Sequence, residues 1–153
     1  MVDGAIELDG IDNYISTPFI LNQGETSAFS VFAWIKGGLP GQVILSQANG
    51  VNWLSVSPLD GCLMAGKGTG RGACELLSEV IITDGEWHRI GFTWDGNYRI
   101  LYVDDVIAAI DTQSNLQSSE GGLYIGAGKG LDEVTFWSGF IDDIRIYDRV
   151  IIP

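Results

Sequence analysis

Apolar and polar residues alternate in short runs along the whole chain, and this period of two is typical of β-strands. The stretch "SGFIDDIRIYDR" at 138–149 shows the alternation clearly, and it places Phe140, Ile144 and Ile146 on one face that we expect to turn toward a core. About a dozen such runs follow one another, with turn signals such as "LDG" and "WDGN" between them and no predicted helix. The pattern predicts an all-β fold in which two antiparallel sheets pack as a jelly-roll sandwich.

Asp142 interrupts this pattern because it lies on the predicted core face of its strand. A buried carboxylate costs free energy unless a partner compensates its charge. That partner could be a divalent cation, backbone N–H groups or an arginine; alternatively, a β-bulge turns the side chain out to solvent. The sequence leaves these alternatives open.

Residues 87–111 predict a three-stranded meander with tight turns at 95–97 and 104–105. The middle strand is largely apolar on both faces, which indicates an interior position in its sheet.

The chain of 153 residues fits a single domain over 1–153 and is long enough to bury roughly two thirds of its unfolded surface. It begins at "MVDGAIELDG" and ends with the apolar "RVIIP". We therefore expect a module cut from a longer polypeptide.

The formal net charge of −12 changes the list of possible partners. A surface this acidic repels phosphate backbones and anionic lipid, so we expect no nucleic acid as partner. Membrane insertion is not expected either, because no run approaches the roughly 20 apolar residues that a span requires. An acidic surface is compatible with calcium, which prefers carboxylate and carbonyl oxygens.

Cys62 and Cys74 flank the glycine-rich stretch "LMAGKGTGRGA". If both segments are strands joined by a turn, the two sulfurs face each other across a hairpin, and we expect a disulfide of the kind found in exported proteins. The alternative is two separate thiols, each packing as a small apolar residue.

Five segments carry a family resemblance: "AIELDGIDNYI", "FSVFAWIK", "ITDGEWHRIGFTWDGNYRILYVDDVIAA", "LYIGAG" and "SGFIDDIRIYDR". In this order and at about this spacing they are similar to the laminin-G-like jelly-roll domains of the concanavalin A-like lectin/glucanase superfamily. The resemblance implies a sandwich whose first and last strands lie side by side. It also implies a mostly non-catalytic family, whose members belong to secreted or surface proteins and bind glycans or proteins.

Calcium is the cofactor that this resemblance implies, because many members of the family bind it. With first and last strands adjacent, "ELDGIDNY" comes close to the final strand, and we expect Asp9, Asp12 and Asp142 to hold one structural calcium ion. The chain departs from the family pattern at Asn13, which replaces a second aspartate.

Glycoside hydrolases of the same superfamily carry their two carboxylates at alternating positions of one strand, so that both enter one cleft. This chain has no such string; its acidic pairs at 104–105, 132–133 and 142–143 are adjacent residues, which point to opposite faces of a strand. His88 has no nucleophile or orienting carboxylate in its local sequence and is interpreted as structural. We therefore expect no enzymatic activity.

Aromatic rings that stack on sugars, together with planar polar groups, are the candidate ligand-binding features. Trp53, Tyr124 and Trp137 are the predicted platforms, and Arg71 in the glycine-rich turn is a predicted polar contact. Trp53 alternates with polar neighbours at 52, 55 and 57, which favours a solvated face for it. Packing in the core is the alternative for each aromatic residue. Four others stand where the family carries an aromatic and are expected to pack: Trp34, Trp87, Trp94 and Tyr147.

The sequence thus predicts a non-catalytic carbohydrate-binding module of an exported or cell-surface multidomain protein, with a polysaccharide or glycan as its partner. The alternative is a protein-interaction, adhesion or spacer module that binds no glycan.

Overall fold

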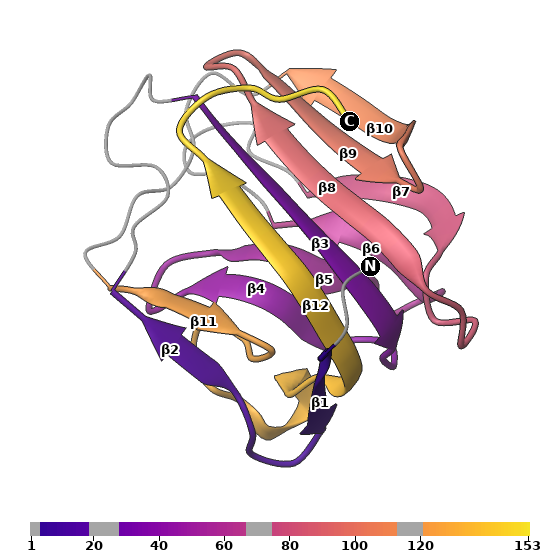
Figure 1. Ribbon diagram of the computed structural model, residues 1–153, viewed down its shortest axis with the longest axis vertical. Helices are drawn as coiled ribbons and strands as arrows, with labels where there is room; N and C mark the ends of the chain where they lie inside the picture. Colours follow the sequence, from indigo (N-terminus) through magenta and orange to yellow (C-terminus); the bar gives the residue numbers. More distant parts are fainter. Residues whose placement is uncertain (1–3, 19–27, 67–74, 113–120) are drawn as a thin grey trace.

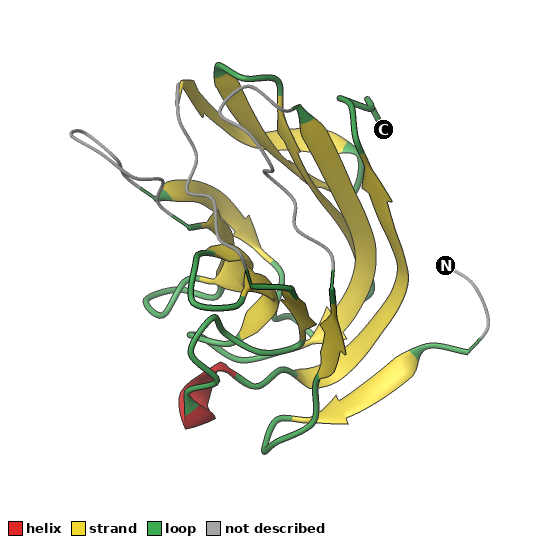
Figure 2. Ribbon diagram, turned by 90° about the vertical axis from the view of Figure 1, so that its left-hand side faces the viewer, coloured by secondary structure: helices red, strands yellow, loops and turns green. Residues whose placement is uncertain are grey.

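A computed structural model of the chain describes residues 4–18, 28–66, 75–112 and 121–153. Within them, twelve β-strands form two six-stranded sheets that face each other (Figures 1 and 2). The first sheet, sheet A, has the order β1 (Ile6–Asp9), β12 (Ser138–Tyr147), β3 (Phe29–Gly37), β8 (His88–Trp94), β9 (Tyr98–Val103) and β10 (Val106–Thr112). Sheet B has the order β2 (Ile15–Thr17), β11 (Leu123–Ile125), β4 (Val43–Gln47), β5 (Asn52–Val56), β6 (Cys62–Ala65) and β7 (Leu76–Ile81). The predicted two-sheet antiparallel sandwich is confirmed.

Connections between the strands also follow the sequence pattern. β8, β9 and β10 form the predicted meander, and β9 is interior because it pairs with both of its neighbours. Asp104 and Asp105 make the second turn with positive φ angles of 53° and 66°, a conformation that aspartate tolerates. The first and last strands lie side by side, with Ile6 opposite Ile141.

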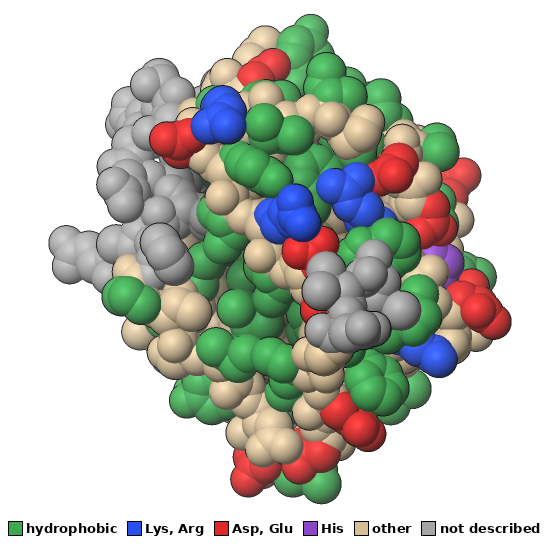
Figure 3. All heavy atoms as spheres, in the orientation of Figure 1, with side chains coloured by type: hydrophobic (Ala, Val, Ile, Leu, Met, Phe, Trp, Pro, Cys, Tyr) green, Lys and Arg blue, Asp and Glu red, His purple; other side chains and the backbone are tan. Residues whose placement is uncertain are grey.

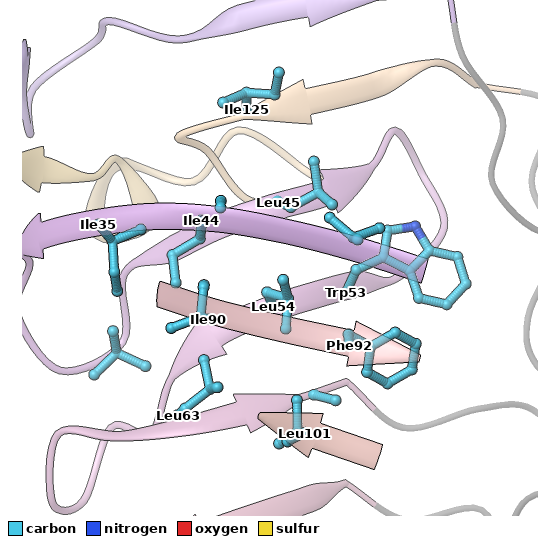
Figure 4. Close-up of a cluster of buried hydrophobic side chains, with 14 of the residues drawn as sticks. Ile35, Ile44, Leu45, Trp53, Leu54, Leu63, Ile90, Phe92, Leu101 and Ile125 are labelled. Atoms are coloured by element: carbon cyan, nitrogen blue, oxygen red, sulfur yellow. The ribbon is translucent and has the colours of Figure 1, made fainter. Parts of the chain in front are cut away.

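The core fills the space between the sheets with aliphatic and aromatic side chains from both of them (Figure 4). Trp53 of β5 meets two rings of sheet A: its centroid lies 5.3 Å from that of Phe29 and 6.2 Å from that of Phe92. Trp94, one of the aromatics expected to pack, is fully buried in the same cluster. Edge-to-face and tilted contacts of this kind add to the stabilisation that burial provides.

A β-bulge in β12 explains Asp142. Asp142 pairs with Trp34 and Arg145 with Phe32, so two residues of β12 oppose one residue of β3, and Asp143 adopts a φ of 48°. Before the bulge Ile141 faces the core, and after it Ile144 packs there, so neither Phe140 nor Asp142 does. The expected core face of Phe140, Ile144 and Ile146 is therefore confirmed only at Ile144, since Phe140 faces outward and Ile146 is 37% exposed. The alternative that a bulge turns Asp142 outward is correct.

A buried ion pair joins β9 and β10. The Arg99 guanidinium has no solvent exposure, and it donates Nε–H and Nη2–H to the two carboxylate oxygens of Asp111 at 2.9 and 2.6 Å. Its Nη1–H donates to the carbonyl oxygen of Gly66, which follows β6, at 2.9 Å. Arg99 therefore ties sheet A to sheet B through charge-assisted hydrogen bonds.

Candidate functional site

Two of the predicted aromatic platforms lie in the core. Trp53 is 3% exposed and Trp137 is fully buried, so neither can present a ring face to a ligand. Trp53 is the extra residue of a bulge between β4 and β5, which turns it inward and defeats the expectation from strict alternation. Trp137 lies against Gly38, where an added Cβ would come within 2.3 Å of the indole ring. The packing alternative is therefore correct for both, and Arg71 lies outside the described residues.

Tyr124 is the predicted platform that stays at the surface. It is half-buried on β11, and its ring forms an edge-to-face pair with Tyr14, with centroids 5.3 Å apart at 77°. Tyr14 immediately precedes β2, is 38% exposed, and rests on the buried ring of Phe136 at 6.0 Å. We call Tyr14, Tyr124 and Phe136 the tyrosine rim. Sequence analysis missed Tyr14, whose place beside Tyr124 depends on the pairing of β2 with β11.

The loop between β11 and β12 closes one side of the tyrosine rim and contains the single-turn 3₁₀ helix η1 (Glu133–Thr135; Figure 2). Lys129 donates its backbone N–H to Asn52 Oδ1 at 2.9 Å, and Gly128 donates to Thr135 Oγ1 at 3.1 Å. Hydrogen bonds to sheet B and within the loop hold its backbone in one conformation. Ligand binding to such a preorganised loop loses little conformational entropy.

Aromatic residues also lie on the outer side of sheet A, among them Trp34, Trp87 and Phe140. Trp34 is half-buried opposite Asp142, and half-buried Trp87 meets Phe140 with ring centroids 6.0 Å apart. The expected core packing of Trp34 and Trp87 is thus wrong, because both occupy outward positions of the alternation. These residues form a second, separate aromatic surface.

The residues expected to bind calcium are not brought together. Asp9 Oδ1 accepts the backbone N–H groups of Ile11 and Asp12 at 2.9 and 3.4 Å, which closes the turn after β1 and lowers the pKa of Asp9. Asp9 pairs with Ser138, four residues from Asp142 and thus about 13 Å away along the strand, whereas calcium holds its ligands at about 2.3–2.6 Å. The described parts of the chain contain no group of three or more His, Cys, Asp or Glu side chains that could hold a metal ion. The ligand set is therefore wrong, and calcium binding stays a prediction from the resemblance.

Cys62 has a free, buried thiol, which contradicts the expected bridge. β6 and β7 do form the predicted hairpin, but its register places Cys62 opposite Ile81, and Cys74 lies outside the described residues. Burial and the neighbouring Asp60 carboxylate raise the pKa of the Cys62 thiol. Cys62 thus behaves as a small apolar core residue.

His88 has two carboxylate partners that its local sequence did not reveal. Its Nδ1 lies 2.8 Å from Asp104 Oδ2 and its Nε2 lies 2.8 Å from Asp84 Oδ1. Burial lowers the pKa of His88, but the hydrogen bonds to Asp104 and Asp84 outweigh it and raise that pKa above 6.5. When the ring is protonated, it donates to both carboxylates and bridges the turn before β8 and the turn after β9.

This bridge predicts a pH dependence of stability. Because the folded-state pKa of His88 is raised, its contribution is complete below about pH 6.5 and is lost as the pH rises through the folded value. We expect His88→Gln to cost about 1–2 kcal/mol at pH 6 and clearly less at pH 9. Urea unfolding of the parent protein and of His88→Gln at pH 6 and pH 9 measures the difference in free energy of unfolding. An equal cost at the two pH values would contradict a charged bridge.

Two of the three adjacent acidic pairs, 104–105 and 142–143, make structural contacts through their side chains, whereas Asp132 and Glu133 are exposed. Asp104 binds His88, and Asp143 accepts Arg145 Nε–H at 2.9 Å. The three described carboxyl groups whose pKa is displaced are all displaced downward: Asp9 and Asp60 by backbone N–H groups, and Asp84 by the His88 ring. A glycosidase needs the opposite, a carboxylic acid whose pKa is raised.

None of the described helical segments is long and apolar enough to cross a membrane.

Comparison with known proteins places this geometry in a wider group. Residues 9–153 match a family model described as "Concanavalin A-like lectin/glucanases superfamily". Domain 4 of an extracellular arabinanase from Geobacillus stearothermophilus, solved with arabinotriose, is similar with a TM-score of 0.69 and 20% identity, over 97% of this chain and 74% of that one. Domains LG4-5 of the mouse laminin α1 chain are similar with a TM-score of 0.67 and 16% identity, over 97% of this chain and 43% of that one. A pentraxin from Limulus polyphemus is similar with a TM-score of 0.61 and 19% identity, over 96% of this chain and 76% of that one. No curated protein matches the chain in sequence. At these identities the structural likeness shows the fold.

Proposed function

Because the chain belongs to the concanavalin A-like lectin/glucanase superfamily, we propose that it is a non-catalytic carbohydrate-binding module whose tyrosine rim contacts the sugar. The observation that carries the proposal is the Tyr14–Tyr124 pair: two adjoining phenol rings at the surface, one of them resting on a buried ring. Phenol rings offer an apolar face for a sugar ring and hydroxyl groups that hydrogen-bond to it. The arabinotriose complex of the similar arabinanase domain supports this class of ligand.

The absence of catalysis in this proposal is supported by the structural contacts of Asp104 and Asp143 and by the lowered pKa values of Asp9, Asp60 and Asp84. An exported or cell-surface location, as a module of a longer protein, is part of the same proposal. It is supported by the laminin and the extracellular arabinanase among the similar structures. Incubation with any polysaccharide that the module binds should release no reducing ends.

A panel of neutral polysaccharides in affinity gel electrophoresis tests the proposal. We expect at least one, such as arabinan, to retard the protein, and we expect Tyr14→Ala and Tyr124→Ala each to weaken binding about tenfold or more, because each removes half of the ring pair. Tyr98→Ala is the matched control, since Tyr98 is an exposed tyrosine (45%) on β9 of the other sheet. No retardation by any polysaccharide, with the protein folded, would overturn the proposal.

The aromatic surface on sheet A favours the alternative function, a protein-interaction module. Trp34, Trp87 and Phe140 stand beside Lys36, Arg89 and Asp142, a mixture of aromatic and charged groups that protein interfaces also use. Sugar binding that is lost in Trp34→Ala and kept in Tyr124→Ala would move the site to this surface.

A further inference from the structure

Exposed charges of mostly one sign lie on the two chain segments that lead into the tyrosine rim. Asp9 is the last residue of β1, and Asp12 lies in the turn between β1 and β2, which leads into Tyr14. The loop that leads to Phe136 presents Asp132, Glu133 and one base, Lys129. In the orientation of Figure 3, acidic side chains gather at the lower end of the molecule, where Figure 1 places this turn and this loop. Four carboxylates thus stand against one ammonium group.

We infer that the tyrosine rim selects uncharged saccharides and excludes, by charge, polysaccharides that carry carboxylate or sulfate groups. The inference rests on the proposed function and narrows its ligand class. An anionic sugar ring on Tyr14 and Tyr124 would bring its charge toward Asp12, Asp132 and Glu133, and Lys129 alone does not balance these carboxylates. A neutral ring meets no such repulsion, and its hydroxyl groups can donate hydrogen bonds to the same carboxylates.

The expected size of the effect follows from Coulomb's law. An unpaired charge at about 8–10 Å in water changes the affinity for an anion about twofold, so three uncompensated charges change it about tenfold. Salt screens this term, because the Debye length falls from about 30 Å at 10 mM to about 3 Å at 1 M. Selectivity should therefore be largest at low salt and nearly absent at 1 M, whereas ring stacking persists at both.

A pair of chemically matched probes separates charge from shape. Each polysaccharide of the neutral panel, arabinan first, is compared as its carboxymethyl and its hydroxyethyl derivative at equal degrees of substitution. For any polysaccharide that retards the protein, we expect the hydroxyethyl derivative to bind about tenfold more tightly at 10 mM salt, and the ratio to fall below about twofold at 1 M. A ratio near one at 10 mM, or tighter binding of the carboxymethyl form, would overturn the inference and leave the proposed function standing. If no polysaccharide of the panel binds, both fall together.

Variants then assign the selectivity to this site. We expect the combination Asp12→Asn, Asp132→Asn and Glu133→Gln to bring the ratio of the two affinities at 10 mM salt close to one. Asp9 is left in place because its carboxylate holds the turn. Glu79→Gln is the matched control, since it removes an exposed charge from β7 at the opposite edge of sheet B. An equal change of the ratio in the control, per charge removed, would show an effect of net charge alone and would also overturn the inference.

Discussion

Replacing Arg99 by methionine is expected to lower the free energy of unfolding by about 3–5 kcal/mol, because the change leaves the Asp111 carboxylate without its bidentate partner. It also removes the hydrogen bond that the Gly66 carbonyl oxygen accepts from Nη1. Urea unfolding at pH 7, followed by tryptophan fluorescence, measures the difference.

The loss could come from the unpaired Asp111 carboxylate or from the missing contacts of Arg99 itself, and the double variant Arg99→Met and Asp111→Leu separates the two. Replacing both partners of a buried ion pair by apolar groups is often neutral or stabilising. We therefore expect the double variant to be more stable than Arg99→Met alone. If it were the less stable of the two, an unpaired Asp111 could not be the cause of the loss. Arg145→Met is the surface control, because the Arg145 side chain is exposed and water screens its ion pair with Asp143.

Replacing Trp53 by alanine is expected to cost about 3–5 kcal/mol of stability, because it leaves a cavity between the sheets where Phe29 and Phe92 now contact the indole. It also breaks the hydrogen bond from Nε1–H to Gln47 Oε1, at 3.3 Å. The free energy of unfolding from denaturant titration gives the magnitude.

Sugar binding by Trp53→Ala tests the conclusion that Trp53 is a core residue and not a ligand contact. Any Trp53→Ala protein that remains folded should bind the polysaccharide as the parent does, because the side chain is in the core. Trp53→Phe, which fills much of the cavity and loses only the hydrogen bond and part of the ring, keeps this test available if the alanine variant does not fold. A folded Trp53→Phe protein that has lost sugar binding would return Trp53 to the list of ligand contacts.

The fold could be predicted because its signals are local and repeated. Alternating runs and turn residues define most strands, and the segment at 87–111 carries its own meander in two tight turns. The family resemblance added the pairing of β1 with β12, which spacing alone does not give.

Two of the errors have their physical origin in bulges. Strict alternation assigns Trp53 and Phe140 to the wrong faces, because one extra residue in a strand reverses the direction of every side chain after it. Nothing in the residue types around Asp142 distinguishes a bulge from a buried carboxylate. The sequence therefore predicted that Asp142 was unusual, but it left open whether a partner or a bulge accounts for it.

The candidate site was partly predictable for a different reason. Tyr124 was found from its own strand, but its partner Tyr14 lies more than a hundred residues away, and only the tertiary structure brings the two rings together. The same holds for Arg99 and Asp111, which are ordinary charges in the sequence and become a buried pair through the register of β9 and β10.

The tyrosine rim stands where the chain passes twice between the two layers. The turn before Tyr14 carries the chain from β1 of sheet A to β2 of sheet B, and the loop before Phe136 carries it back from β11 of sheet B to β12 of sheet A. A ligand that contacts both the β1–β2 turn and the β11–β12 loop opposes any sliding of one sheet over the other. Because such a molecule binds only the folded arrangement, it also raises the melting temperature by mass action. The sandwich would therefore be harder to pull apart while it holds its ligand than when it is empty.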